Sequence, residues 1–417
     1  MEAAIDQLMS AHVAANGPGA AIGVIRDGAF VHRKAYGMAD LEWGAALRPD
    51  CVFRIASLTK QFTAMAVMML EERGALSIDD PLERWLPDWP PRGRRVTLRH
   101  LLNHTSGVWR HDGADMPERT LRANLANDEV RRMIGEHSFE FEPGAHYRYN
   151  NSGYLLLGAV IEAASGRPYA DFLAEAIFQP LGMTHTGLLT VEAITPLRAR
   201  GYVSGRRGFH NARPDPFNWS NGAGGLGSTL DDLARWDAAV RGHRLVRPET
   251  MQGMLADTPL ADGSTFPYGL GWGTGTWNGA RFFHHTGGVS GFASHMLHLR
   301  DQALTTIVLS NLYLFPFDQV TRCLVRIAKG SPYEPPPRSH PTPEQWATMG
   351  GVYGETDWRP DFRMIFEEGP TYQAVADDVL CEANDPEVEY RFSDLRDGRF
   401  HQVDCHSPLW PVMSYRR

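Results

Sequence analysis

The spacing of one serine and one lysine could support nucleophilic catalysis. Ser57 and Lys60 lie three residues apart, and on a helix this spacing places two side chains on the same face. The chain has only three lysines among its 41 lysine and arginine residues. Arginine keeps its proton in proteins, whereas a buried lysine can become neutral and accept one. We interpret the pair as a nucleophile and its base, with a helix N-cap and a solvated lysine as the structural alternative.

Two later segments contain groups that would complement this pair. Tyr149 and Asn151 lie in a turn-rich stretch before a predicted helix, where a phenol could relay a proton and an amide could bind substrate. His285 begins a His-Thr-Gly-Gly sequence whose glycines, up to Gly288, allow backbone to approach a ligand closely. Core packing for Tyr149 and turn formation for Asn151 and Gly288 are the structural alternatives. His284 is the alternative to His285, because neighbouring strand residues face opposite sides.

Two other patterns are weaker matches to known chemical motifs. Residues 222–227 fit GxGxxG, but residues 214–221 do not predict the strand that a dinucleotide site needs. A tight turn is expected instead, leading to a helix capped near Thr229 by Asp232. His100 and His104 have the spacing of zinc ligands on a helix. No glutamate follows His100, so both are interpreted as core or turn histidines. We therefore expect neither a metal nor a cofactor.

The surrounding sequence predicts the elements that position these residues. Residues 20–36 predict a β-hairpin with its turn at Asp27-Gly28. Apolar residues recur at helical spacing from Ser57 to Gly74, which places Ser57 in the first turn of a buried helix. Further helices are predicted at 98–102, 154–164, 169–177, 230–240 and 318–328. Strands are predicted at 282–286, 292–299 and 305–309, joined by turns at Gly287-Gly288 and Asp301-Gln302.

Strands near both ends with helices between them predict an α+β fold. Its antiparallel sheet would be built from both ends of the first domain, with flanking helices and an inserted helical lobe. We expect this domain to span residues 1–332. A proline-rich linker would follow at 333–343, and residues 344–417 would form a small antiparallel β module.

Composition favours a small-molecule partner. A formal net charge of -8 and a pI near 6.1 give no electrostatic reason to expect binding to nucleic acid or to a membrane. The N-terminal residues lack the pattern of a secretory signal, and no stretch approaches the ~20 apolar residues of a membrane span. The four widely spaced cysteines are expected to be reduced thiols. These features predict a cytoplasmic protein, and its oligomeric state stays unknown.

The ordered motifs resemble those of a family of serine hydrolases that includes class C β-lactamases, penicillin-binding DD-peptidases, esterases and D-aminopeptidases. The motifs of this family run SxxK, YxN, and lysine or histidine followed by Thr-Gly. The chain has them in that order at 57–60, 149–151 and 285–287. The similarity covers about residues 10–330 and includes accessory segments at 101–107, 224–228 and 268–272. It implies a β-lactamase/transpeptidase-like fold.

The resemblance also implies a role for each residue of the site. Ser57 would form an acyl-enzyme with an amide, peptide or ester substrate. The residues assigned by the resemblance are Ser57, Lys60, Tyr149 and His285 for catalysis, Asn151 for substrate binding, and the N–H groups of Ser57 and Gly288 for the oxyanion hole. His285 would hold Tyr149 in place or bind a substrate carboxylate.

Segments 57–63 and 141–147 are most similar to D-aminopeptidases, which implies a D-stereospecific aminopeptidase or amidase. His285 stands where β-lactamases usually have lysine, which counts against efficient β-lactam hydrolysis. The C-terminal part is shorter than the barrel domains of such D-aminopeptidases. A carboxylesterase or acyltransferase therefore remains an alternative hypothesis. A non-catalytic β-lactamase-like binding protein is the third.

Overall fold

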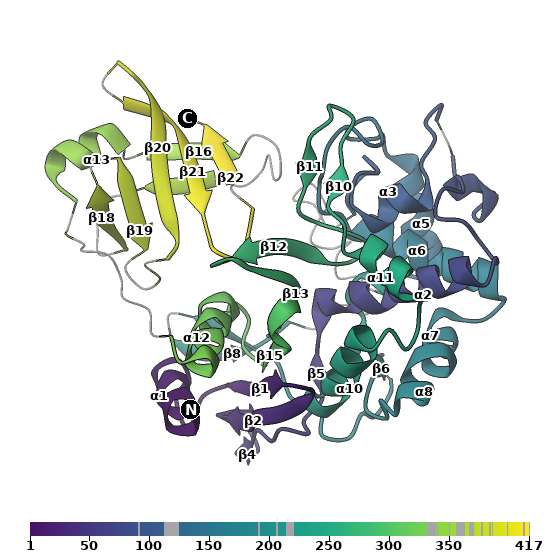
Figure 1. The fold of residues 1–417 in the computed structure, drawn as a ribbon, viewed down its shortest axis with the longest axis horizontal. Helices are drawn as coiled ribbons and strands as arrows, with labels where there is room; N and C mark the ends of the chain where they lie inside the picture. The colour runs from purple at the N-terminus through teal and green to yellow at the C-terminus, as the bar shows by residue number, and fades with distance from the viewer. Residues whose placement is uncertain are drawn as a thin grey trace. The chain divides into compact units, whose positions relative to one another are not determined.

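The computed structural model contains two compact units, which are described separately (Figure 1). The first comprises Met1–Thr274 and Ala280–Ser331, and the second comprises Gly275–Gly279 and Pro332–Arg417. The structure describes residues 1–90, 92–111, 125–190, 192–205, 207–213, 221–331, 339, 341–349, 351–355, 363–366, 371–376, 378–382, 385, 387–397, 399–411 and 413–416. Most of the predicted linker and residues 214–220, where we expected no strand, lie outside these residues.

A six-stranded sheet organises the first unit, in the order β12-β13-β14-β15-β1-β2. β1 (Ala20–Arg26) and β2 (Ala29–Tyr36) form the predicted hairpin, and both turn residues between them have positive φ. β1 also pairs antiparallel with β15 (Leu304–Ser310), so the two ends of the unit meet in one sheet. This pairing of early and late strands is visible in Figure 1. The predicted sheet built from both ends is confirmed.

The predicted turn at Gly287-Gly288 is wrong. β13 (Ala280–Val289) continues through both glycines, and the chain turns at residues 290–291 before β14 (Phe292–Leu299). A Cβ on Gly287 would lie 2.4 Å from the Ile55 carbonyl oxygen. Gly287 therefore allows two backbone segments to approach closely. Gly291, with φ +83°, allows the chain to turn.

Helix α2 (Thr59–Glu72) follows a 3-10 turn, η1 (Ala56–Leu58). Every residue from Thr59 to Leu70 is buried, and Gly74 beyond the end of α2 has φ +70°. The predicted buried helix is confirmed, although Ser57 lies in the preceding 3-10 turn. The short strand β5 (Phe53–Arg54) lies just before this turn in the chain. It pairs antiparallel with β9 (Leu226–Ser228).

Helices cover both faces of the sheet. On β14, His298 contacts α10 (Leu230–Arg241) through Asp237, whereas His295 packs against Phe317 of α12 (Phe317–Lys329). The remaining helices of the unit are α1 (Glu2–His12), α3 (Leu98–Leu102), α5 (Asn127–Glu136), α6 (Asn151–Ser165), α7 (Tyr169–Leu173) with a π-helical continuation at Ala174–Phe178, α8 (Gln179–Leu181), α9 (Asn221–Gly224) and α11 (Pro248–Met254). Its remaining strands are β3 (Met38–Asp40), β4 (Ala45–Ala46), β6 (Gly187–Leu188), β7 (Tyr202–Gly205), β8 (Gly208–Asn211), β10 (Thr258–Pro259), β11 (Thr265–Phe266) and β12 (Gly273–Trp277), whose last three residues are assigned to the second unit.

The second unit contains helix α13 (Pro343–Met349) and a seven-stranded antiparallel sheet in the order β17-β16-β22-β21-β20-β19-β18. The strands are β16 (Gly351–Glu355), β17 (Arg363–Phe366), β18 (Tyr372–Ala376), β19 (Val379–Glu382), β20 (Glu389–Arg396), β21 (Arg399–His406) and β22 (Met413–Arg416). Its core includes Met349, Tyr353, Leu380, Tyr390, Phe392, Val403 and Tyr415. This unit therefore has a hydrophobic core of its own.

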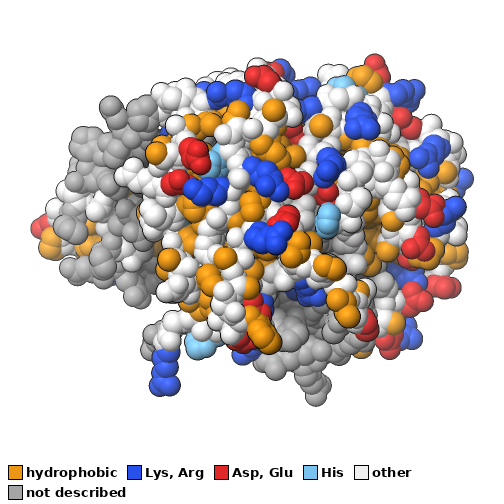
Figure 2. Space-filling model, turned by 90° about the horizontal axis from the view of Figure 1, so that it is seen from below, with side chains coloured by type: hydrophobic (Ala, Val, Ile, Leu, Met, Phe, Trp, Pro, Cys, Tyr) orange, Lys and Arg blue, Asp and Glu red, His pale blue; other side chains and the backbone are white. Residues whose placement is uncertain are grey.

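Charged side chains of both signs are interspersed on the face shown in Figure 2. Several form surface ion pairs, such as Arg33 with Asp231 and Arg99 with Asp79. No disulfide joins the four cysteines. Among the described residues, no helix has both the length and the apolar composition required to cross a bilayer.

Candidate active site

Lys60 is the centre of the candidate site. Its side chain is fully buried, and its Nζ donates to Ser57 Oγ at 3.1 Å, to Asn151 Oδ1 at 2.6 Å and to the Ala223 carbonyl oxygen at 2.7 Å. The structure thus brings together three of the residues predicted from sequence. Ser57 itself is half-buried, so its hydroxyl lies at the border between the core and solvent.

These three partners of Lys60 differ in what they can do with a proton. The amide oxygen of Asn151 and the carbonyl oxygen of Ala223 only accept hydrogen bonds, whereas the Ser57 hydroxyl can donate or accept. A neutral amine has two N–H donors, and the two acceptor-only oxygens, which are also the closer ones, would occupy both. Its lone pair would then face Ser57 Oγ. This geometry suits a base that removes the serine proton.

The backbone around Ser57 is held in a strained turn. Ala56 has φ +49°, a left-handed conformation that costs a non-glycine residue on the order of 1 kcal/mol. Neighbouring segments fix it in place: the Ile55 N–H donates to the Leu226 carbonyl at 3.0 Å, and Ser294 Oγ donates to the Ile55 carbonyl at 2.8 Å. These hydrogen bonds therefore hold the strained turn, and with it Ser57, in one conformation.

The glycine-rich segment proves to be part of this support. Where a tight turn was expected, residues 221–224 form the short helix α9, which contributes the Ala223 carbonyl, and β9 follows it. A Cβ on Gly222 would lie 2.6 Å from the Tyr154 carbonyl oxygen, so only glycine permits this approach. The expected helix cap after the segment is confirmed, because Thr229 Oγ1 accepts from the Asp232 N–H at 3.2 Å.

Tyr149 lies next to Lys60, at the entry to α6. The Lys60 Nζ is 4.8 Å from the centre of the Tyr149 ring, and the His104 ring packs on Tyr149 with 4.4 Å between centroids. Asn150 caps α6 by accepting from the Ser152 N–H at 2.8 Å, which fixes where the helix begins. Tyr149 and Asn151 thus flank the cap residue, and the cap positions both.

His285 joins the site through another tyrosine. Its Nε2 lies 3.0 Å from Tyr268 Oη, and its Nδ1 lies 2.6 Å from the Thr286 carbonyl oxygen. Its ring centroid is 6.1 Å from that of Tyr149. His284 faces the other side of β13, where its Nδ1 lies 3.0 Å from His295 Nε2. His285, and not His284, therefore lies on the side of β13 that faces Tyr149 and Tyr268.

Burial determines the charge of these groups. Burial, followed by the nearby charge of Lys60, lowers the pKa of His285 to about 3 and lowers the pKa of His104 well below its usual value. Both rings are therefore neutral near pH 7. Burial also raises the pKa values of Tyr154 and Tyr268 well above 10, so these phenols stay protonated. A neutral His285 lacks the positive charge that would attract a substrate carboxylate.

Gly288 is placed on the strand that passes the serine turn. It is exposed near the end of β13, paired with Ala293, while the preceding Gly287 packs against Ile55. A Cβ at Gly288 would meet no atom within 4 Å. The strand edge is therefore open to solvent at the residue expected to donate to the oxyanion.

Three contributors to the site were not identified from sequence: the Ala223 carbonyl, Tyr268 and His104. His104 was interpreted as a core or turn residue, and it is buried, with φ +61°. Its Nε2 also lies 3.2 Å from Tyr268 Oη. His104 and Tyr268 lie in the accessory segments 101–107 and 268–272, and this similarity to the family was the only sequence signal that pointed to them. A backbone carbonyl has no residue type to reveal it.

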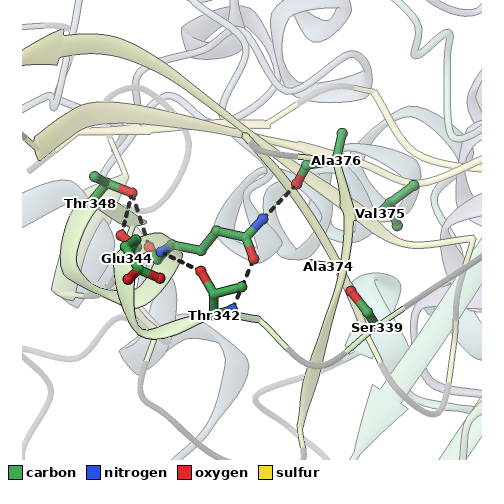
Figure 3. Close-up of a pocket in the computed structure, with 8 residues that line it drawn as sticks. Ser339, Thr342, Glu344, Thr348, Ala374, Val375 and Ala376 are labelled. Atoms are coloured by element: carbon green, nitrogen blue, oxygen red, sulfur yellow. Dashed lines mark hydrogen bonds between the residues drawn. The ribbon is translucent and has the colours of Figure 1, made fainter.

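A separate pocket of about 500 Å³ lies in the second unit (Figure 3). Gln345 spans it, donating from Nε2 to the Ala376 carbonyl at 3.1 Å and accepting at Oε1 from the Thr342 N–H at 2.9 Å. Its described lining residues include no histidine, lysine or tyrosine. Among all described residues, no cluster of three or more metal-ligating side chains occurs.

Comparison with known proteins identifies the family. The family model described as Beta-lactamase matches residues 3–326. The chain belongs to the β-lactamase family, and with it to the serine hydrolases. Penicillin-binding protein 4* of Bacillus subtilis (strain 168) is 32% identical over 329 residues, which cover 75% of this chain and 72% of that protein. Family membership confirms the resemblance inferred from the motifs.

Other relatives are named as peptidases, esterases and amidases. The D-aminopeptidase of Gluconobacter oxydans (strain 621H) is 30% identical over 76% of this chain, which spans 60% of that relative's length. Esterase EstB of Burkholderia gladioli is 33% identical over 62% of this chain and 74% of its own length. The crystal structure of D-amino acid amidase from Ochrobactrum anthropi SV3 superposes with a TM-score of 0.69 at 25% identity, covering 79% of this chain and 99% of that one. This similarity confirms the predicted fold class.

Proposed function

We propose that this serine hydrolase forms an acyl-enzyme at Ser57 and is a D-stereospecific amidase or aminopeptidase. The observation that carries the mechanism is the geometry of Lys60, a buried amine whose partners include two acceptor-only oxygens and one serine hydroxyl. All the proposed site residues lie within residues 1–332, which we propose as the hydrolase domain.

Acylation would begin with proton transfer from Ser57 to Lys60. Ser57 Oγ then attacks the substrate carbonyl, and the resulting oxyanion lies against the N–H groups of Ser57 and Gly288. Loss of one such donor typically costs about 3 kcal/mol of transition-state stabilisation. Gly287 lets β13 approach the serine turn, which supports this placement of the two donors.

Breakdown of the tetrahedral intermediate requires a proton on the leaving amine or alcohol. Tyr149, 4.8 Å from Lys60 Nζ measured to the ring centre, is the proposed relay from the lysine to the leaving group. Water then enters and attacks the acyl-enzyme, with the same groups acting in reverse. Asn151 would hold the substrate amide as well as orient Lys60.

Two comparisons support D-amino acid derivatives as the substrate class. They are the D-aminopeptidase relative and the D-amino acid amidase structure. The neutral state of His285 also fits substrates whose reacting end carries an uncharged amide. Phenylalanine amide and alanine p-nitroanilide, each as both enantiomers, are therefore suitable test substrates.

Ester hydrolysis or acyl transfer through the same acyl-enzyme is the second candidate. The observation that favours it is the similarity to esterase EstB, of which this chain covers 74%, against 60% of the D-aminopeptidase. Short p-nitrophenyl esters, with and without an amine acceptor, test this candidate. Turnover of esters without turnover of any D-amide would decide for it.

A fluorophosphonate probe tests the nucleophile independently of substrate. We expect one covalent adduct, mapped to Ser57 by peptide mass spectrometry and absent from Ser57→Ala. An adduct at another serine would refute the assignment, and a folded wild-type protein that takes no adduct would favour a non-catalytic binding protein.

A further inference from the structure

A hydrogen-bonded chain of side chains runs behind Tyr149. It starts at the Asn150 N–H, which donates to His104 Nδ1 at 3.1 Å, and continues from His104 Nε2 to Tyr268 Oη at 3.2 Å. Tyr268 Oη then lies 3.0 Å from His285 Nε2. The chain ends where His285 Nδ1 meets the Thr286 carbonyl oxygen at 2.6 Å. All three side chains are buried.

The two ends of this chain determine the direction of every hydrogen bond in it. A backbone N–H can only donate, so His104 Nδ1 accepts, and the proton of the neutral His104 ring is on Nε2. A carbonyl oxygen can only accept, so the proton of the neutral His285 ring is on Nδ1, and its Nε2 must accept. The Tyr268 oxygen then accepts from His104, and its hydroxyl donates to His285. The Tyr154 phenol, whose own hydroxyl donates to the Leu102 carbonyl at 2.6 Å, is the other neighbour of the Tyr268 hydroxyl.

We propose that Tyr268, oriented by His104, is a positioning residue for the third motif: its hydroxyl fixes His285 as the Nδ1–H tautomer, which anchors the Thr286 carbonyl and thereby the backbone at Gly288. This inference rests on the proposed function for its kinetic consequences. The assignment of the tautomer itself stands on the geometry of the hydrogen bonds together with the neutral state of His285.

The consequence for the site follows from the strand. Thr286 lies two residues before Gly288 on β13, so a bond from His285 to its carbonyl restricts rotation of the peptide plane that leads toward the proposed oxyanion donor. The opposite tautomer would place a lone pair of Nδ1 against the lone pairs of this carbonyl. Repulsion would then replace attraction, and the strand would lose one of its local restraints.

The same side chains also pack against Tyr149, the proposed proton relay. The Tyr149 ring is bordered by the rings of His104, Tyr268 and His285, with centroid separations of 4.4, 6.5 and 6.1 Å. His104 keeps a left-handed backbone, φ +61°, which persists only where the surroundings over-determine it. The side chains of this hydrogen-bonded chain therefore pack against Tyr149, and its last bond restrains the backbone that leads to Gly288.

Nitrogen-15 spectra of the imidazole rings test the tautomer directly. Protein labelled with [15N]histidine is recorded at pH 7, and the His285 signals are assigned as those missing from His285→Gln. We expect a protonated Nδ1 and an unprotonated Nε2. The reverse pattern, or two protonated nitrogens, would overturn the proposal. The experiment works equally well in Ser57→Ala protein, so its result does not depend on whether the proposed function is correct.

Tyr268→Phe tests the role of the hydroxyl. We expect mixed tautomers at His285 and a kcat lower by about tenfold to a hundredfold, as for loss of one buried hydrogen bond, with KM changed much less. The matched control is Tyr353→Phe, which removes a buried hydroxyl that donates to the Met349 carbonyl at 2.9 Å in the second unit. The control should keep the His285 signals and kcat.

Two outcomes of this comparison would refute the positioning role. One is a folded Tyr268→Phe protein with wild-type His285 signals and wild-type kcat. The other is an equal loss of kcat in both variants with unchanged His285 signals, which would indicate a general effect of removing a buried hydroxyl. If Tyr268→Phe does not fold, the wild-type spectrum still decides the tautomer.

Discussion

Replacement of Lys60 by arginine separates proton acceptance from positive charge. Arginine retains the charge and the N–H donors, but its guanidinium does not release a proton in a protein. In the structure, Nζ must donate to Asn151 and Ala223 while receiving the proton of Ser57. A general base typically contributes 10²–10⁴-fold to a rate, so we expect Lys60→Arg to lower kcat by about that factor, or ~3–5 kcal/mol.

The fully buried position of Lys60 adds a structural cost to this substitution. A larger side chain forced into a packed site typically costs about 1–3 kcal/mol of folding free energy. Lys60→Met is a useful companion, because it preserves the approximate volume and removes both charge and base. It also removes the donor to the Asn151 and Ala223 oxygens, at about 1–3 kcal/mol for each acceptor left unsatisfied. Thermal unfolding of both variants establishes that they are folded under assay conditions.

The assay measures the rate of fluorophosphonate labelling and the kcat for a short p-nitrophenyl ester. Lys34→Arg is the matched control, because Lys34 has a 42% exposed side chain paired with Asp6 at 2.7 Å and should tolerate the change. We expect wild-type rates from the control and large losses from both Lys60 variants. A folded Lys60→Arg enzyme that retains kcat within about tenfold of wild type would refute the assignment of Lys60 as the base.

Three further predictions follow from other contacts. Asn151→Ala removes the closest partner of Lys60, at 2.6 Å, and should lower kcat by about tenfold to a hundredfold in the ester assay; an unchanged kcat would contradict its orienting role. Gly287→Ala should destabilise the fold by about 1–3 kcal/mol, because its Cβ would meet backbone at 2.4 Å, whereas Gly288→Ala should leave the unfolding midpoint unchanged in urea. Burial lowers the pKa values of His284 and His285 to about 3, below the ~6.5 of an unfolded chain, so the unfolded state binds more protons as pH falls below 6.5. The free energy of unfolding should therefore be about 4 kcal/mol lower at pH 5 than at pH 7, and pH-independent urea unfolding over this range would contradict neutral buried histidines.

Much of the fold was predictable because local chemistry agrees with the final structure. The Asp27-Gly28 turn, the helix that ends before Gly74 and the cap at Thr229 each depend on residues close in sequence. The turn placed at Gly287-Gly288 failed for the opposite reason. Glycine marks both turns and close backbone approaches, and only the packing of Ile55 against β13 distinguishes them.

The sequence by itself determined the residue types of the site and their order along the chain. One lysine retained among many arginines, one serine three residues before it, and the later tyrosine, asparagine and histidine indicated a serine nucleophile and its partners. These signals survive in sequence because the chemistry depends on the side chain itself. Arginine cannot replace lysine as a base.

Tertiary structure decided how those groups are held. Lys60 meets Asn151 across 91 positions and the Ala223 carbonyl across 163, and neither contact leaves a periodic or local signal. The same holds for the His104–Tyr268–His285 chain, because its tautomers depend on which nitrogens meet a backbone N–H or a carbonyl. Main-chain groups are the same at every residue, so only the folded chain shows which of them orient the base and the third motif.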